Sequence, residues 1–435
     1  MYKSTLILVS GITAALVLSG CEKADLDTAQ QSGAQPPLPE AKNYLVPPIH
    51  VPTRVGWQNN ETPQVAEGLE ITKIADGFEH SRQVLPLPNG DILVVEGNSP
   101  GTASVTSPKQ LIANKVKARS GKGGTGGNRV TLLRPQSDGS YRKYPYIEHL
   151  NSPFGIQLVG DDLYIANTDG LLRYHYRPDE TKMSSEAEAF TDLPDTINHH
   201  WTKSLLASQD GRKLYVGVGS NSNVGENGLE VEYRRAAVLE VDIASRGSRI
   251  FASGVRNPTA LDWEPNTGKL WVVANERDEI GSDLVPDYLT SLQDDGFYGW
   301  PYSYYGQHVD TRVQPQRPDL VEKAITPDYA LGSHVAALGV HFSRGDGLPE
   351  QYRHGVFVSE HGSWNRSPLS GYRVTFIPFS EGKPTGPPQP VVTGFISDDE
   401  SELHGAPVGL AQLQDGSLLV ADDVGNTIWK ISAAN

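Results

Sequence analysis

The sequence has almost no cysteine and none of the common cofactor-binding loops. Cys21 is the only cysteine among 435 residues, which rules out an internal disulfide and a cysteine-based metal or haem site. There is no Gly-x-Gly-x-x-Gly motif after a first strand, no phosphate-binding loop and no Gly-x-Ser-x-Gly elbow. Nicotinamide, nucleotide and covalent serine chemistry therefore have no support in the sequence.

Positive charge is also scarce. Asp and Glu outnumber Lys and Arg by 52 to 37, which gives a formal net charge of −15. Polyanions repel such a chain, so nucleic acid and an anionic lipid surface are poor partners for it.

Long apolar runs are missing except near the start of the chain. After Lys3, the apolar run Thr5–Leu18 is shorter than the roughly 18–20 residues of a spanning helix, which favours a cleaved export signal. It ends in Leu-Ser-Gly before Cys21, the pattern that precedes the lipidated cysteine of bacterial lipoproteins. We predict a signal over residues 1–20 and a periplasm-facing membrane lipoprotein. Glu22 after the cysteine favours sorting to the outer membrane. The alternative is an ordinary export signal after which Cys21 stands by chance.

The next residues show no apolar periodicity. Residues 22 to about 45 are rich in Gln, Ser, Ala and Pro, so residues 21–60 are predicted to be the lipidated cysteine and a flexible linker. The remainder, residues 61–435, is long enough for a large core. With 44 glycines and 31 prolines in the chain and few stretches at helical spacing, many short strands joined by turns are expected.

One phrase recurs along this domain: a turn, an apolar strand and a polar or Gly-rich exit. It occupies Asn89–Glu96, Gly160–Asn167, Asp210–Gly219, Thr267–Asn275, Tyr352–Ser359 and Asp415–Asp422. Six units over this length suit four-stranded sheets repeated around an axis. The prediction is an all-β fold, a single six-bladed β-propeller; a sandwich or two β domains with similar hairpins is the alternative.

Chemically useful side chains cluster in two short phrases beside the repeats. Asn198–Lys203 contains paired histidines next to Trp and Lys, and a histidine suits proton abstraction from an alcohol. A turn histidine that binds the backbone is the plainer alternative. Gly254–Pro258 places an Arg beside an Asn, which suits a planar ligand with carboxylate or carbonyl oxygens.

Three further loops carry polar or aromatic residues. Asn275–Asp283 is rich in oxygen ligands and fits a hard cation such as calcium, although a solvated acidic loop has the same composition. Pro327–His334 and His361–Arg366 offer aromatic and cationic groups for a flat anionic ligand or a sugar. Trp364 could equally serve in blade packing.

Several long phrases resemble one family. HHWTKS, GVRNPTALDWEP, NERDEIGSDLVPDYLT, GFYGWPYSYYGQ, PDYALGSH, HGSWNR and PVGLAQLQDGSLLVADDVGNTIW are similar to sequences of the sorbosone/glucose dehydrogenase family of quinoproteins. The resemblance runs from about residue 65 to the C-terminus. It implies pyrroloquinoline quinone (PQQ) and Ca²⁺ as cofactors on a six-bladed propeller.

The resemblance also implies roles for individual residues. His200 corresponds to the catalytic base, and the backbone carbonyls of Glu276 and Arg277 correspond to calcium ligands. Matches to cofactor-contacting positions, or candidates for them, are Arg256, Asn257, Asn275, His334, Trp364 and Arg366. The implied activity is PQQ-dependent oxidation of an aldose or similar polyol, with electrons passed to a quinone or cytochrome.

One position departs from the family pattern. Relatives commonly read Gly-Arg-Pro-Val-Gly where this chain has Ala406 in place of the arginine. Loss of one charged hydrogen bond to a buried anion costs roughly 1.5–3 kcal/mol. Arg366, Arg373 and Lys203 are candidates to replace it. A calcium-dependent sugar lactonase and a propeller that acts only as a binding module remain as alternative functions.

Overall fold

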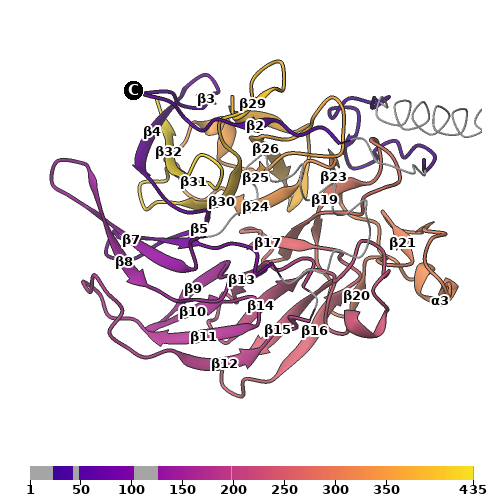
Figure 1. Cartoon of the computed structure of the whole chain (residues 1–435), viewed down its shortest axis with the longest axis horizontal. Coiled ribbons are helices and arrows are strands. Elements are labelled where there is room, and N and C mark those ends of the chain that lie inside the picture. The colour runs from indigo at the N-terminus through magenta and orange to yellow at the C-terminus, as the bar shows by residue number, and fades with distance from the viewer. Residues whose placement is uncertain (1–22, 43–48, 102–125, 197, 435) are drawn as a thin grey trace, which may run out of the picture.

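The computed structural model of the chain describes residues 23–42, 49–101, 126–196 and 198–434. It is a six-bladed β-propeller, and the sheets follow one another around the molecule in chain order (Figure 1). The predicted signal segment and Cys21 lie outside the described residues. Within the described ranges, no helix combines the length and apolar character needed to cross a bilayer.

The blades are built from consecutive antiparallel strands. Blade 1 consists of β5 (Ser81–Pro86), β6 (Ile92–Glu96), β7 (Arg129–Pro135) and β8 (Tyr141–Ile147). Blade 2 consists of β9 (Gly155–Val159), β10 (Asp162–Ala166), β11 (Gly170–His175) and β12 (Glu188–Asp192). Blade 3 consists of β13 (Lys203–Ala207), β14 (Lys213–Val218), β15 (Ala237–Asp242) and β16 (Ser248–Ser253).

The other three blades follow the same plan. Blade 4 consists of β17 (Pro258–Trp263), β18 (Leu270–Ala274), β19 (Pro286–Ser291) and β23 (Tyr329–Ser333). Blade 5 consists of β24 (Ala337–Phe342), β25 (Gly355–Glu360), β26 (Arg373–Ser380) and β28 (Gln389–Thr393). Blade 6 consists of β30 (Pro407–Gln412), β31 (Leu418–Asp422), β32 (Thr427–Ala433) and, from the N-terminal part, β4 (Leu69–Asp76).

The structure also contains short elements besides the four main strands of each blade. They are β1 (Ser32–Gly33), β2 (Thr53–Arg54), β3 (Gln64–Val65), β20 (Gly296–Phe297), β21 (Ser303–Tyr304), β22 (His308–Val309), β27 (Lys383–Pro384), β29 (Glu402–Leu403), α3 (Pro318–Val321) and two 3₁₀ turns, Glu230–Glu232 and Glu350–Tyr352.

Each recurring phrase of the sequence forms the turn and second strand of a blade, which confirms the predicted fold. Strands β6, β18 and β31 are buried along their whole length because they pack on both faces. The innermost strands of all six blades line a central cavity of about 360 Å³. Pairing of β4 with β32 joins the two ends of the domain and closes the ring.

The segment predicted to be a flexible linker differs from that expectation. β1 adds to blade 4 by pairing with β23, and β2 pairs with β29. Gln31 is 1% exposed. Residues 23–33 therefore pack on the propeller, because their backbone and polar side chains find partners on blades 4 and 5.

Candidate functional site

The predicted site residues gather at one end of the propeller. In blade 4, Pro258 at the start of β17 pairs with Ala274 at the end of β18. In blade 3, Lys203 at the start of β13 pairs in the same way with Val218 at the end of β14. In each of these blades, the residues just before the first, innermost strand therefore lie beside the residues just after the second strand. The candidate residues of blades 3 and 4 occupy these two kinds of position.

A cavity of about 340 Å³ lies at this end, within the usual size range of ligand pockets. Its walls are formed by His199, His200, Arg256, Asn257, Asn275, Glu276, Asp278, Asp287, His334, Ala336, Trp364 and Asn365. Apart from Arg277 and Arg366, the structure thus brings together the residues predicted for catalysis, cofactor and metal.

His200 reaches the cavity from the loop before β13. Its Nδ1 lies 2.9 Å from the carbonyl oxygen of Ser220 and 3.1 Å from the Ser220 hydroxyl. Because a carbonyl oxygen can only accept, Nδ1 carries the proton and Nε2 keeps a lone pair. Burial, followed by the charge of Arg256, holds the pKa of His200 well below its usual value. At neutral pH His200 is therefore an uncharged base.

Gly219 allows His200 and Asn257 to approach each other. A Cβ atom on Gly219 would lie 2.3 Å from Asn257 Oδ1 and 2.5 Å from His200 Cβ. Both distances are far below van der Waals contact, so a larger residue would displace one of the two side chains.

Arg256 is 2% exposed and is fixed by oxygen atoms on several sides. Its Nη1 donates to the carbonyl oxygen of Glu276 at 2.6 Å, and its Nε donates to that of Asn223 at 3.2 Å. Nη2 donates to Asn223 Oδ1 at 3.0 Å and lies 3.4 Å from Asp278 Oδ2. A positive charge of fixed position therefore lies at the cavity wall.

Several oxygens of the cavity residues are buried without a hydrogen-bond partner among the described residues. They are Asn257 Oδ1, Asn275 Oδ1, Glu276 Oε1 and Asn365 Oδ1. A buried acceptor left unpaired costs about 1–3 kcal/mol, which indicates a ligand that supplies donors or positive charge. Amide and carboxylate oxygens are ligands that calcium accepts. In the ranges that the structure describes, His, Cys, Asp and Glu form no metal-holding group of three or more.

Asp287, near the start of β19, ties two walls of the cavity together. Its Oδ1 accepts the Glu276 N–H at 2.8 Å, and its Oδ2 accepts the Ala336 N–H at 2.7 Å. Burial raises the pKa of Asp287 to about 8. This carboxyl group sets the position of the loop after β18 relative to the start of β24.

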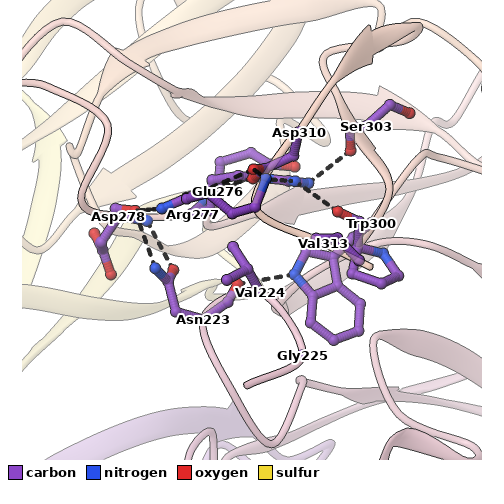
Figure 2. Close-up of polar contacts among 12 residues, drawn as sticks. Asn223, Val224, Gly225, Glu276, Arg277, Asp278, Trp300, Ser303, Asp310 and Val313 are labelled. Carbon is purple, nitrogen blue, oxygen red and sulfur yellow. Dashed lines mark hydrogen bonds and ion pairs between the residues drawn. The ribbon is translucent and has the colours of Figure 1, made fainter. Parts of the chain in front are cut away.

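Arg277 does not line the cavity; its side chain lies in a buried charged network with Glu276 and Asp310 (Figure 2). Its Nε donates to Glu276 Oε2 at 3.0 Å, and its Nη1 donates to Asp310 Oδ2 at 3.1 Å. Nη2 donates to the carbonyl oxygen of Ser303 at 2.6 Å. The side chain of Arg277 therefore fixes one carboxylate oxygen of Glu276, while the other oxygen, Oε1, stays without a partner.

Asn223 holds the other side of this network (Figure 2). Its Nδ2 donates to the carbonyl oxygen of Asp278 at 3.0 Å, and its Oδ1 accepts the Asp278 N–H at 2.9 Å. Its own carbonyl oxygen accepts the indole N–H of Trp300 at 2.9 Å. Asn223 therefore fixes the backbone of the loop that follows β18.

The connection from blade 4 to blade 5 and the loop after β25 supply further parts of the cavity wall. His334 Nε2 lies 3.0 Å from the carbonyl oxygen of Gly281, and its Nδ1 lies 3.5 Å from Asp278 Oδ1. Asn365 Nδ2 donates to the same Asp278 oxygen at 2.9 Å. Burial lowers the pKa of His334 below its usual value. Together with Trp364, these groups add polar and aromatic surface to the cavity wall.

The arginine missing at Ala406 is not replaced by any of the three predicted candidates. Arg366 is directed to the N-terminal segment, where its Nη2 donates to the carbonyl oxygen of Leu26. Arg373 Nε donates to Glu360 at 2.8 Å. The remaining candidate, the lysine at the start of β13, is fully buried against the carbonyl oxygen of Trp201.

Another guanidinium approaches position 406 from blade 1. Arg82 Nη1 donates to Asp423 Oδ2 at 2.5 Å, and the Asp423 N–H donates to the carbonyl oxygen of Ala406 at 3.2 Å. The guanidinium lies 5.4 Å from the ring centre of Trp201, and His361 Nε2 lies 2.7 Å from the other Asp423 oxygen. Arg82 was not expected from the sequence, because it is more than 300 positions from Ala406.

Sequence reasoning also missed Asn223, Asp278, Asp287 and Asn365. Three of them stood in phrases that had been singled out: Asp278 belongs to the acidic loop considered for calcium, Asp287 belongs to the phrase NERDEIGSDLVPDYLT, and Asn365 follows Trp364. Asn223 had no signal, since only the folded chain brings it to the loop after β18.

The chain is similar to proteins of known family. A family model described as TrAA12-like matches residues 63–287 and 311–434. An uncharacterised protein of Borreliella burgdorferi is 27% identical over 373 residues, covering 83% of this chain and 94% of that protein. A pyrroloquinoline quinone-dependent pyranose dehydrogenase of Coprinopsis cinerea is 23% identical over 293 residues, covering 54% of this chain and 39% of that protein.

Solved structures share the fold. The holo form of the pyranose dehydrogenase PQQ domain from Coprinopsis cinerea matches with a TM-score of 0.69 at 20% identity, covering 88% of this chain and all of that one. The apo soluble aldose sugar dehydrogenase of Escherichia coli matches with a TM-score of 0.58 at 14% identity, covering 84% of this chain and all of that one. The resemblance predicted from the sequence is thereby confirmed.

Proposed function

Because the chain belongs to the TrAA12-like family, we propose that it is a PQQ-dependent dehydrogenase that oxidises an aldose sugar or a similar polyol. The observation that carries the proposal is the placement of His200. Its unprotonated Nε2 belongs to a cavity that also contains a fixed guanidinium, that of Arg256, and several unpaired acceptors. The names of the relatives agree with sugar oxidation.

The residues of the cavity fit a flat anionic cofactor with a cation. Arg256 and the amide groups of Asn257 and Asn275 would hold carboxylate or quinone oxygens, and Trp364 offers an aromatic face. When bound, PQQ supplies the hydride acceptor, and Ca²⁺ supplies Lewis-acid polarisation.

His200 would receive the proton of the substrate hydroxyl at Nε2. Its ring is oriented for this by the Ser220 carbonyl oxygen, which fixes the proton on Nδ1. The adjacent Arg256 disfavours a charged imidazolium, so the proton would be held only briefly. The same guanidinium would stabilise negative charge that develops on an oxygen beside it.

For the cation, the family resemblance implies the carbonyl oxygens of Glu276 and Arg277 as ligands. The first of these already accepts a hydrogen bond from Arg256, so a cation there needs an anionic ligand between the two positive charges. The unpaired side-chain oxygens of Asn257, Asn275 and Glu276 are additional ligands within the same cavity.

The same oxygens support a second candidate, a calcium-dependent sugar lactonase. That chemistry requires carboxylate and amide side chains that converge on one metal. Asn257, Asn275, Glu276 and Asp287 line one cavity, as such a site requires. In a lactonase, the buried carboxyl group of Asp287 would belong to the metal site, and no quinone would be needed.

We further propose export and lipidation at Cys21, with electron transfer to a quinone or cytochrome at the membrane. The N–H of Ala24 donates to the carbonyl oxygen of Ser367 at 2.7 Å. Three residues span at most about 10 Å, so a lipid on Cys21 would hold the domain directly at the bilayer. This replaces the long tether expected from the sequence.

Reconstitution separates the two enzymes. The purified domain is loaded with PQQ and Ca²⁺ and assayed for dye reduction with aldoses and alcohols, and for lactone hydrolysis with Ca²⁺ alone. Dye reduction that falls at least 100-fold in His200→Ala supports the dehydrogenase. Hydrolysis without PQQ supports the lactonase, and absence of both activities and of quinone binding would exclude both enzymes.

A further inference from the structure

The N-terminal residues 23–33 lie outside the part of the chain that matches the family model. We propose that this segment, here called the strap, is a positioning element of the candidate site. It fixes the loop that carries Asp278 and the loop that carries Trp364. The inference does not depend on which ligand the cavity binds.

The first anchor of the strap is Asp283, which is 6% exposed. Its Oδ2 accepts the N–H of Asp25 at 2.6 Å. Gln31 Nε2 lies 3.1 Å from both the carbonyl oxygen and Oδ1 of the same aspartate. A buried carboxylate without hydrogen-bond donors carries a desolvation cost, so the donors from the strap stabilise the end of the loop that contains Asp278.

The second anchor is Arg366, which is 1% exposed. It donates from Nη2 to the carbonyl oxygen of Leu26 and from Nη1 to that of Pro368 at 2.8 Å. Asp283 lies 3.6 Å from the same guanidinium, so both anchors belong to one buried cluster. Trp364 precedes Arg366 by two residues, which couples its position to the strap.

The third anchor is the edge of blade 4. Gln31 Oε1 accepts the N–H of Ser333 at 3.2 Å, next to His334 in the cavity wall. A Cβ atom on Gly332 would lie 2.5 Å from Thr28 Cγ2. Because glycine has no side chain, Thr28 of the strap can pack against it. Gln31 therefore bridges Asp283 and the residue before His334.

These anchors share one physical consequence. His334 Nε2 donates to the carbonyl oxygen of Gly281, and this bond joins the two segments that Gln31 also joins. Without the strap, the relative position of the two segments would depend on Asp287 and on the pairing of β19 with β23. Displacement of site groups by about 1 Å is enough to impair ligand binding and catalysis.

The test compares Gln31→Ala with Gln30→Ala in the protein without added ligand. Gln30 is the matched control because it is exposed and its side-chain oxygen accepts the N–H of Asp27, a residue of the strap itself. Two readouts are used: amide hydrogen exchange of residues 278–283 and 333–337, and the downfield proton resonance of His334 Nε2–H. Asp283→Asn serves as a second variant that leaves the strap sequence intact.

We expect exchange in both segments to rise at least tenfold in Gln31→Ala and Asp283→Asn, with loss of the His334 resonance and no change in blades 1 and 2. Gln30→Ala should match the parent protein. Faster exchange confined to residues 23–33 would overturn the proposal, as would an equal rise in all blades. An unchanged His334 resonance in both variants would also overturn it.

Discussion

Arg256 donates a hydrogen bond from Nη1 to the carbonyl oxygen of Glu276 at 2.6 Å. This bond joins an arginine for which the family resemblance implies cofactor binding with a carbonyl group for which it implies calcium binding. The two roles therefore depend on each other. An anion that enters the cavity therefore changes the electrostatic environment of Arg256 and of the Glu276 carbonyl group together.

The first prediction concerns the pH dependence of His200. The charge of Arg256 contributes to its lowered pKa, so Arg256→Gln should raise the pKa toward the usual value. A base works only above its pKa, so the acid limb of the kcat/KM profile should move to higher pH. The profile is measured from pH 4 to 9 for both proteins. An acid limb that stays in place would contradict the role of His200 as the base.

The second prediction concerns Gly219. In Gly219→Ala the new methyl group meets the side chains of Asn257 and His200, so we expect a loss of about 1–3 kcal/mol in stability and at least tenfold in kcat/KM. Gly247→Ala is the control, because its added Cβ atom meets only Ser245 Oγ, at 3.4 Å. Urea unfolding and steady-state assays compare the two. Equal behaviour of both variants would refute the steric argument.

The third prediction concerns Arg82. If this guanidinium compensates for Ala406, Arg82→Lys should weaken PQQ binding by about tenfold, because a lysine cannot keep the separate contacts of Arg82 with Asp423 and with the carbonyl oxygen of Gly97 and also reach a ligand. Calorimetric titration of PQQ into the protein measures the effect. Arg373→Lys, whose parent side chain pairs with Glu360, should bind PQQ as the parent protein does. If Arg82→Lys binds PQQ with unaltered affinity, Arg82 does not contact the cofactor.

The fourth prediction concerns His341, which lines the central cavity between the innermost strands, and its effect on stability. Burial lowers the pKa of His341 to about 4. The unfolded chain binds a proton there near pH 6.5, while the folded protein does so only near 4. The contribution of His341 to stability is therefore present above about pH 6.5 and is lost as pH falls toward 4. Thermal unfolding of His341→Gln should show a flatter dependence over this window, and an identical slope in both proteins would refute the assignment.

The sequence predicted the propeller because its evidence is local and repeated. The phrase Asp415–Asp422 and its five counterparts each combine a turn with a strand that must be buried, and burial of such strands requires neighbouring blades. Residues such as His200 and Arg256 could be found because they stand in short phrases beside these strands.

The roles of other residues could not be predicted from their local sequence. Asp287 acts on the site through N–H groups of two separate loops, and Arg366 looked available for a ligand until the fold directed it to Leu26. The segment around Gln31 was misread for the same reason. Its composition is that of a flexible chain, but partners more than 250 residues away hold it in place.

The recurring strands by themselves determined an all-β propeller, and the single cysteine excluded an internal disulfide. Only the tertiary structure decided which side chains share the cavity, which acceptors stay unpaired in it, and that the N-terminal segment belongs to the domain. The physical reason is that strand burial is encoded within each repeat, whereas hydrogen bonds between distant loops exist only when the ring has closed.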